Sequence, residues 1–386
     1  MQLSTSRSLL LLVAVILLSC SLILIFGNAI QDIGMIENAR TCKFKKAKQF
    51  SLDEPFFVQD SKECPKLRGL VSKTADFDKP KVRVLSAHVM KPELVRLQKR
   101  SLELFLEDEY EYIVYGGDAP TNIAAENNMW NPTVNNAIEN VAKEIGIKFR
   151  RIPPEIHQHR ECIFPKTSIE RSTLNPTQNS RSSDAIQFMF RDAINFCSRD
   201  LIVILDADMI LIKSISFQKL LGNYNAAGIE QGRTDMSAGG DVHLRYMFTG
   251  PLLFDMNGLP KKDLINFDWG HVHPEIGGHK FHLFLDTSGF TYEWLLQAAP
   301  KVLWLDRDAN ENHHRLAKIW TEKVTSKFPL LDSSSFEYCA NKTVLHLRNG
   351  SNWKKLGKNY NESIKYEYEA INDFISSLKP SKVLAA

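Results

Sequence analysis

The first strong pattern in the chain is an unbroken apolar run near its N-terminus. Residues 9–26 read LLLLVAVILLSCSLILIF, and no charged residue occurs between Arg7 and Asp32. As a helix, this run would span about 27 Å, close to the thickness of a bilayer's hydrocarbon core. The pattern predicts a signal-anchor transmembrane helix at residues 9–30. Cleavage behind the small residues that follow the run is the alternative, and it would release a secreted protein.

Beyond residue 80 the pattern changes to short apolar runs that alternate with stretches of helical spacing. The run at residues 201–205, LIVIL, is wholly apolar, which is typical of a strand buried on both faces of a parallel sheet. Strands are expected at residues 82–88, 112–115, 147–152 and 201–205, and helices at residues 92–106, 135–145, 183–196 and 366–378. This alternation predicts an α/β/α sandwich with a mostly parallel central sheet, in which ligands bind beyond the carboxyl ends of the strands.

Composition narrows the class of protein. The chain has 386 residues, of which 44% are hydrophobic, so wholesale disorder is excluded. A net charge of +3 is too small for a dedicated nucleic-acid binder, and we expect no nucleic-acid partner. The domain order that follows is a short tail at residues 1–8, the membrane helix, a polar stem at residues 31–80 and one folded domain at residues 81–386.

Two features of the sequence disagree on which side of the membrane the C-terminal part lies. Lys and Arg residues between positions 40 and 48 would favour the cytosol by the positive-inside rule. Three glycosylation sequons, at Asn341, Asn349 and Asn361, favour a lumenal C-terminal part. We expect a single-pass type II membrane protein facing the lumen of the Golgi or the endoplasmic reticulum. Five cysteines lie beyond the apolar run, and their spacing does not fix a pairing.

The clearest chemical signal is an acidic pair at the end of the fourth expected strand. Asp206 and Asp208 follow directly on the apolar run at residues 201–205. Two carboxylates buried without a partner would be costly, and a divalent cation would neutralise both. Oxygen ligands favour Mn²⁺ or Mg²⁺ over zinc. Such an ion can hold the diphosphate of a nucleotide.

The segment around this pair, DLIVILDADMILIKSI, resembles the D-x-D segment of GT-A-fold glycosyltransferases, and other segments extend the likeness to a relative of glycosyltransferase family 8. These segments are residues 181–187 (RSSDAIQ), 249–257 (TGPLLFDMN), 285–292 (LDTSGFTY) and 344–353 (VLHLRNGSNW). In the last segment Gly350 follows His346 by four residues where family 8 has three, so the likeness is to a relative of that family. The resemblance implies a GT-A-like fold and a glycosyltransferase catalytic domain at residues 81–386.

The resemblance also implies roles for the residues of the acidic site. Asp208 would bind the metal directly, Asp206 would bind the metal, the donor ribose or both, and His346 would complete the metal ligands. Arg348, Lys354 or Lys355 would reach the diphosphate. The donor would be a UDP- or GDP-sugar, and the acceptor a glycan, protein or lipid.

Two further carboxylates are candidate catalytic residues. Asp184, together with Arg181, would contact the donor sugar. Asp286 would act as a base or as a sugar contact. An inverting reaction requires a carboxylate that deprotonates the acceptor hydroxyl, whereas a retaining reaction requires none.

Two other functional classes fit parts of the sequence. A haloacid-dehalogenase-type phosphatase also carries an apolar strand followed by D-x-D, but that strand usually opens the α/β core. A non-catalytic carbohydrate-binding relative of the transferases is the other alternative, and the intact acidic pair is evidence against it. The histidines between positions 271 and 282 favour a loop over a zinc site. Residues 306–310 favour the start of a helix over a calcium loop.

Overall fold

The computed structural model describes residues 82–88, 91–117, 133–157, 159–165, 178–196, 200–235, 242–272, 275–276, 279–280, 283–308, 314–331, 336–347 and 360–378. The expected transmembrane helix and stem lie outside these ranges. Among the described residues, none of the helices combines the length and the apolar character that crossing a membrane requires.

Three β–α units form the first half of the main sheet. Strands β3, β2, β1 and β4 lie side by side in that order, and each pair is parallel. Parallel neighbours need a crossover, and the helices between the strands supply it. The elements are β1 (Val82–His88), α3 (Pro92–Phe105), β2 (Tyr110–Gly117), α5 (Thr133–Glu144), β3 (Lys148–Ile152), α6 (Gln178–Phe196) and β4 (Leu201–Ile204).

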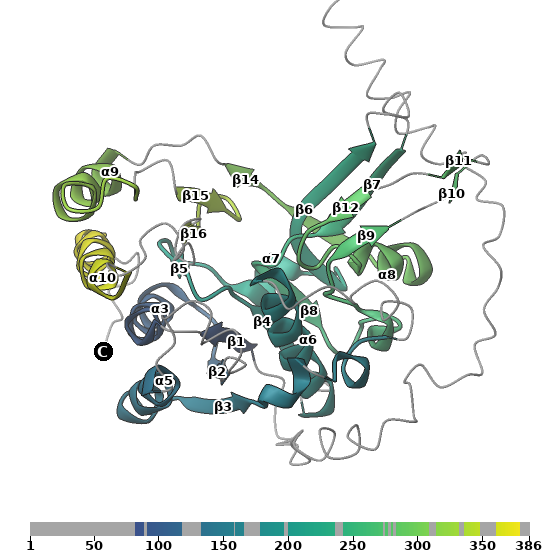
Figure 1. Ribbon diagram of the computed structural model, residues 1–386, viewed down its shortest axis with the longest axis horizontal. Helices are drawn as coiled ribbons and strands as arrows, with labels where there is room; N and C mark the ends of the chain where they lie inside the picture. Colours follow the sequence, from purple (N-terminus) through teal and green to yellow (C-terminus); the bar gives the residue numbers. More distant parts are fainter. Residues whose placement is uncertain are drawn as a thin grey trace, which may run out of the picture. The chain divides into compact units, whose positions relative to one another are not determined.

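Strand β4 shows why residues 201–205 contain no polar side chain. Leu201 and Val203 pack in the core with side chains of α3, α5 and the C-terminal helix α10 (Tyr360–Ser377). Ile202 and Ile204 pack in a second core with side chains of α6. Successive side chains of a strand point to opposite faces, and both faces of β4 are covered, so every position is apolar. Figure 1 shows α3, α5 and α10 on one side of the sheet and α6 on the other.

The second half of the sheet mixes directions. Strand β8 (Leu252–Asp255) is antiparallel to both of its neighbours, β4 and β6 (Ala226–Asp235). Strand β13 (Val302–Leu305) is parallel to β6 and ends the row, while β7 (Val242–Met247) forms an antiparallel pair with β6. The central sheet is therefore mainly parallel, in agreement with the GT-A-like α/β architecture that the sequence predicts.

A second sheet joins the C-terminal region to the acidic pair. Its strands are all antiparallel, in the order β14 (Arg307–Asp308), β15 (Phe336–Cys339), β16 (Val344–Leu347) and β5 (Met209–Leu211). Strand β5 begins one residue after Asp208. Pairing with β16 therefore brings residues more than 130 positions away against the acidic pair.

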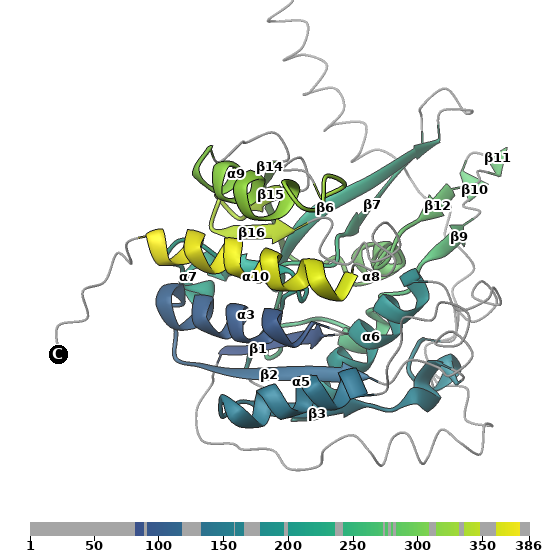
Figure 2. The ribbon, with the colours of Figure 1, turned by 60° about the vertical axis from the view of Figure 1, so that its left-hand side comes forward.

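The remaining elements flank the two sheets. Figure 2 shows α10 lying along α3, and α9 contacts α10 in turn. A buried ion pair between Lys91 and Glu367, 3.5 Å apart, ties α10 to the start of α3. The other elements are η1 (Pro154–His157), η2 (Arg160–Cys162), α7 (Phe217–Leu221), η5 (Lys262–Leu264), β9 (Gly270–Val272), β10 (Glu275–Ile276), β11 (His279–Lys280), β12 (Leu283–Leu285), α8 (Thr291–Ala298), α9 (His314–Trp320) and the π-helix η6 (Thr321–Thr325).

The structure corrects three of the expected elements. Residues 307–308 do not form a helix: Arg307 and Asp308 pair with β15, and the described part of the next helix, α9, begins at His314. The stretch at residues 271–282 is not wholly a loop, because β9 pairs with β12 and β10 pairs with β11. The C-terminal helix begins at Tyr360, six residues before the expected start. In the first case pairing with a strand far along the chain decided the local structure, and the local sequence pattern does not report such pairing.

Candidate metal centre

The acidic pair occupies a short connection between two strands of different sheets. Strand β4 ends at Ile204 and β5 begins at Met209, so the carboxylates lie at the carboxyl edge of the parallel strands. The Met209 amide donates to the Asp206 carbonyl oxygen at 3.0 Å, which closes the turn. Gln98, a buried residue of α3, donates through Nε2 to the carbonyl oxygens of Asp206 (2.9 Å) and Met209 (2.8 Å). The Gln98 side chain therefore fixes the backbone of the connection that carries both carboxylates.

That amide is itself held by two buried side chains from the neighbouring strands. The Tyr112 hydroxyl donates to Gln98 Oε1 at 2.6 Å, and His88 Nε2 lies 3.2 Å from the same oxygen. Burial lowers the pKa of His88 to about 4, so the imidazole is neutral near pH 7. The support behind the acidic pair is therefore a neutral hydrogen-bond network that adds no positive charge to the site.

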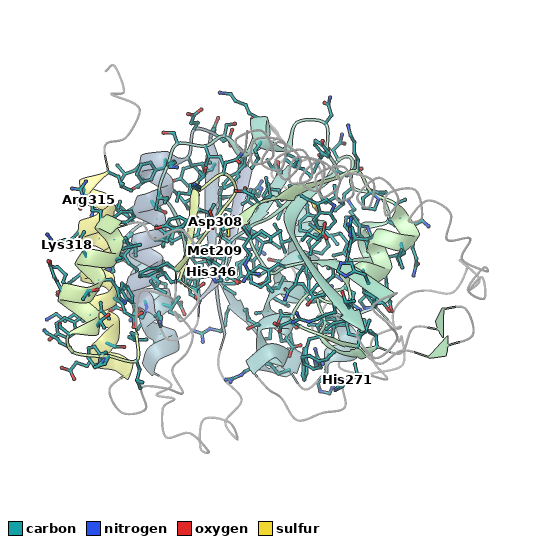
Figure 3. All side chains as sticks on the ribbon, turned by 90° about the horizontal axis from the view of Figure 1, so that it is seen from above. Met209, His271, Asp308, Arg315, Lys318 and His346 are labelled. Atoms are coloured by element: carbon teal, nitrogen blue, oxygen red, sulfur yellow. The ribbon has the colours of Figure 1, made fainter. Side chains whose placement is uncertain are left out.

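The side chains of Asp206, Asp208 and His346 lie close together at this connection. One ligand atom from each residue can be chosen so that all lie within 4.8 Å of one another. His346 Nε2 is 3.5 Å from Asp208 Oδ1, and the Leu347 amide donates to the Asp208 carbonyl oxygen at 3.1 Å. His346 pairs with Met209 in the β16–β5 ladder, and Figure 3 shows these two labelled residues close together.

The protonation equilibria of these side chains are strongly displaced. Burial, and then the charge of Asp208, raises the pKa of Asp206 to about 7, even though the Thr249 hydroxyl donates to its Oδ2 at 3.1 Å. Burial alone would lower the pKa of His346, but the charge of Asp208 and hydrogen bonds to Asp208 and Glu337 raise it to about 10. Asp206 and His346 therefore keep their protons to higher pH than usual, because ionised carboxylates lie close to both side chains.

The donor set fits a hard divalent cation. Two ligand atoms at about 2.1 Å from one ion and at right angles lie about 3 Å apart, which is close to the separation of Asp208 Oδ1 and His346 Nε2. Two carboxylates and one imidazole suit Mn²⁺ or Mg²⁺, and an ion there would replace the protons that the site otherwise retains.

Asp184 belongs to a different group of charges. Its carboxylate accepts from Arg160 Nε at 2.6 Å and lies 2.8 Å from His157 Nδ1. Arg160 also donates to Asp268, which is 1% exposed. We call Asp184, Asp268, Arg160 and His157 the arginine-bridged cluster. Asp184 is 1% exposed and ion-paired, and its sugar-contacting role stays a prediction.

The other predicted residues differ in how far the structure describes them. Asp286 follows β12 and is partly exposed, and its Oδ1 accepts from the Thr287 amide at 2.8 Å. Arg181 lies in the first turns of α6, and burial lowers the pKa of its guanidinium. Arg348 and Lys354 lie outside the described residues. The roles of all four stay predictions.

Several polar residues of the site carried no signal that pointed to them in the sequence. Gln98 reads as an ordinary polar position of a helix, and Arg160 as a solvated charge. Glu337 is the exception, because an acidic residue inside the run Phe336–Cys339, where every side chain is buried, is unusual for a strand. A buried acid in an apolar strand signals a compensating partner, although not which residue provides it.

Comparisons with known proteins yield solved structures only. No protein-family model matches the chain, and no curated protein matches it. The chain is similar to the galactosyltransferase LgtC in complex with donor and acceptor sugar analogs, at 14% identity over 45% of this chain and 58% of that chain, with a TM-score of 0.23. It is also similar to the mannosyltransferase PcManGT from Pyrobaculum calidifontis, in complex with GDP-Man and Mn²⁺, at 14% identity, 53% and 56% coverage and a TM-score of 0.26.

A third similar structure is the apo-form glycosyltransferase GlyE of Streptococcus pneumoniae, at 12% identity, with 79% of this chain and 66% of that chain covered and a TM-score of 0.29. The chain thus spans between about half and two thirds of the length of these structures. At TM-scores this low the similarities carry no argument, and none of them confirms glycosyltransferase family 8 in particular. The case for a function rests on the geometry of the site.

Proposed function

We propose that this protein is a membrane-anchored, metal-dependent glycosyltransferase that moves a sugar from a nucleotide-sugar donor to a glycan, glycoprotein or glycolipid acceptor. The observation that carries the proposal is the convergence of Asp206, Asp208 and His346 at the carboxyl edge of the parallel strands. Residues 206 and 208 form the D-x-D of the sequence resemblance, and His346 is the residue for which that resemblance implies a metal-ligand role. The three meet although two separate sheets supply them.

Each side chain has a task in this proposal. When bound, Mn²⁺ or Mg²⁺ supplies positive charge against the departing nucleoside diphosphate. Asp206 and Asp208 hold that charge in place, and the Thr249 hydroxyl orients the Asp206 carboxylate through its hydrogen bond to Oδ2. Gln98 keeps both carboxylates in register by binding the backbone on either side of Asp208. Arg348 or Lys354 is the proposed further contact with the diphosphate.

The two remaining candidate acids, Asp286 and Asp184, differ in their burial and in their ion pairing. A general base must reach the acceptor hydroxyl and carry negative charge. Asp286 is partly exposed, whereas Asp184 is buried and ion-paired with Arg160. We therefore assign Asp286 as the base of an inverting reaction, or as a sugar contact in a retaining one. Asp184, next to Arg181 in the first turns of α6, is assigned to the donor-sugar side.

The proposed location is the lumen of the Golgi or the endoplasmic reticulum, with the apolar run at residues 9–26 as the anchor. One described feature supports an oxidising compartment. Cys162 is disulfide-bonded, and disulfides persist in the secretory pathway and outside the cell but rarely in the cytosol. Release of the protein after cleavage behind the run is the alternative.

A nucleotide-sugar panel tests the proposed activity. The purified full-length chain in detergent is incubated with UDP- and GDP-sugars and Mn²⁺, and release of free UDP or GDP is measured. We expect release with one donor class, its loss on chelation of the metal, and its loss in Asp208→Ala. Release of phosphate from small phosphoesters, abolished by Asp206→Asn, would instead indicate a phosphatase. Sugar binding without turnover would indicate a non-catalytic carbohydrate-binding protein.

A further inference from the structure

We propose that Glu337 is a positioning residue that, together with Arg307, sets the tautomer of His346 so that Nε2 can bind the metal. The inference rests on the proposed metal site and adds two residues that the sequence resemblance does not include. Neither residue is a metal ligand. Each acts through the orientation and proton placement of His346.

The second sheet brings the three side chains to one face. Glu337 lies directly opposite His346 in the β15–β16 ladder. Arg307 lies opposite Cys339 in the β14–β15 ladder, and positions 337 and 339 share a face because side chains alternate along a strand. Arg307, Glu337 and His346 therefore form a row across three neighbouring strands that ends at the acidic pair.

The Glu337 carboxylate divides its two oxygens between two donors. Oε1 accepts from His346 Nδ1, and Oε2 accepts from Arg307 Nε at 2.7 Å. Glu337 is fully buried, so both oxygens require such partners. A proton on Nδ1 leaves the lone pair of the neutral ring on Nε2, the nitrogen that faces Asp208 Oδ1 at 3.5 Å. Carboxylates that fix a metal-binding histidine in this way raise its basicity and hold its ring.

Arg307 is held in place by more than the ion pair. Its guanidinium lies over the Phe248 ring, 4.6 Å from the centroid, and that ring is 6.0 Å from the His346 ring. Together with Asp206 and Asp208, the row contains three carboxylates and one guanidinium. Two negative charges remain, and one divalent cation neutralises them.

Replacing Glu337 by Gln makes Arg307 and His346 compete for a single acceptor oxygen. In Glu337→Gln one oxygen becomes an amide NH₂, so the side chain can accept from either Arg307 or His346 but not from both. The permanently charged Arg307 keeps the remaining oxygen, and the NH₂ then faces Nδ1. His346 must accept there, which moves its own proton to Nε2 and blocks metal binding. In the double variant with Arg307→Met, the amide is free to rotate and present its oxygen to Nδ1 again.

The test measures Mn²⁺ dissociation constants of the full-length protein in detergent, from the electron paramagnetic resonance signal of free Mn²⁺. We expect Glu337→Gln to weaken binding about 10- to 100-fold, Arg307→Met to weaken it less, and the double variant to bind more tightly than Glu337→Gln. The matched control is Glu367→Gln, which also neutralises a buried, ion-paired acid and should leave Mn²⁺ affinity unchanged.

The outcomes separate the two levels of the proposal. Equal Mn²⁺ affinity of Glu337→Gln and the wild type would overturn the role of Glu337 and leave the proposed metal site intact. A wild type that binds no Mn²⁺ would overturn the metal site and this inference with it. If Glu337→Gln does not fold, ¹⁵N spectra of the Mg²⁺-bound wild type decide. A proton on Nδ1 of His346 supports the inference, and a proton on Nε2 overturns it.

Discussion

Among the described residues, the metal centre and the arginine-bridged cluster differ in how the charge of their carboxylates is balanced. In the arginine-bridged cluster, Asp184 and Asp268 share one guanidinium, and His157 adds a hydrogen bond. At the metal centre, no guanidinium of the described residues bridges Asp206 and Asp208, and burial and mutual repulsion raise the pKa of Asp206 to about 7. In the first cluster the protein itself supplies a counter-charge through Arg160, whereas for the second we propose that a cation from solution supplies it.

The comparison shows that acidity alone does not identify a metal site. Both groups combine buried acids with a histidine, and both lie where chain segments meet at the carboxyl edge of the strands. The difference is the placement of one arginine. Where one fixed guanidinium bridges two acids, it offsets one of their two negative charges, so less charge is left for a metal to neutralise.

The largest effect on stability is expected from Arg160→Met. Removing the guanidinium leaves two buried carboxylates without their counter-charge, at a cost of about 3–5 kcal/mol in the free energy of unfolding. Urea unfolding followed by tryptophan fluorescence measures it. The matched control is Arg245→Met, which breaks the exposed Arg245–Glu230 pair (3.2 Å) and should cost less than about 1 kcal/mol. Similar costs for both variants would mean that the cluster is not balanced by Arg160.

The next effect separates function from stability at the metal centre. Asp208→Asn removes one charged ligand and should lower nucleotide release about 10²- to 10³-fold, the usual loss when one electrostatic contact to the developing charge is removed. The metal-free protein should change little in stability, because relief of the repulsion with Asp206 is offset by loss of the attraction to protonated His346. Initial-rate assays and thermal melts in chelator measure the two quantities. A stability loss as large as that of Arg160→Met would contradict the contrast between the two groups.

A smaller effect is expected from the glutamines that hold each group. Gln98 binds the backbone around Asp208, and Gln187 binds the backbone of Ile265 and Phe267 just before Asp268. Each substitution by Leu leaves buried backbone groups unpaired and should cost about 1–3 kcal/mol. Only Gln98→Leu should also weaken Mn²⁺ binding, which a metal titration of both variants measures. Equal Mn²⁺ affinities would show that the connection after β4 holds its shape without Gln98.

The smallest effect is a pH dependence of the stabilisation that Mn²⁺ provides, which we assign to the metal centre. The folded pKa of Asp206 is raised to about 7, so its contribution to metal-free stability is present below about pH 4 and is lost as the pH rises to about 7. His346, with a pKa raised to about 10, contributes stability below about pH 6.5 that is lost toward pH 10. Mn²⁺ competes with these protons, so the Mn²⁺-induced rise in melting temperature should increase between about pH 5 and pH 8.

Thermal melts with saturating Mn²⁺ and with chelator measure that rise across the pH range. We expect a change of about 1.4 kcal/mol per pH unit for each proton that Mn²⁺ displaces. Asp208→Asn is the control and should flatten the profile, because both the repulsion and the metal ligand are lost. A rise that is the same at every pH would indicate that Mn²⁺ binds elsewhere on the protein.

Much of the fold was predictable from local patterns. The strands at residues 82–88 and 147–152 are confirmed residue for residue or within one residue, because their short runs of strand-favouring residues are visible in the sequence. The short strand at Arg307–Asp308 was missed and a helix expected there, because its structure depends on pairing with β15. The convergence of Asp206, Asp208 and His346 agrees with the sequence resemblance, whereas their proposed roles stay predictions.

By itself the sequence determined the parallel half of the sheet and the position of the acidic pair at a strand end. Those features depend on neighbouring residues, whose hydrophobicity and spacing can be read directly. Only the tertiary structure decided that Arg160 forms an ion pair with Asp184. It also decided that Glu337 contacts both His346 and Arg307. Charge balance is a property of distances between side chains, and folding brings together charges that lie many positions apart along the chain. Which buried acids are ion-paired within the protein, and which are left for a proposed metal, therefore depends on where folding places each guanidinium.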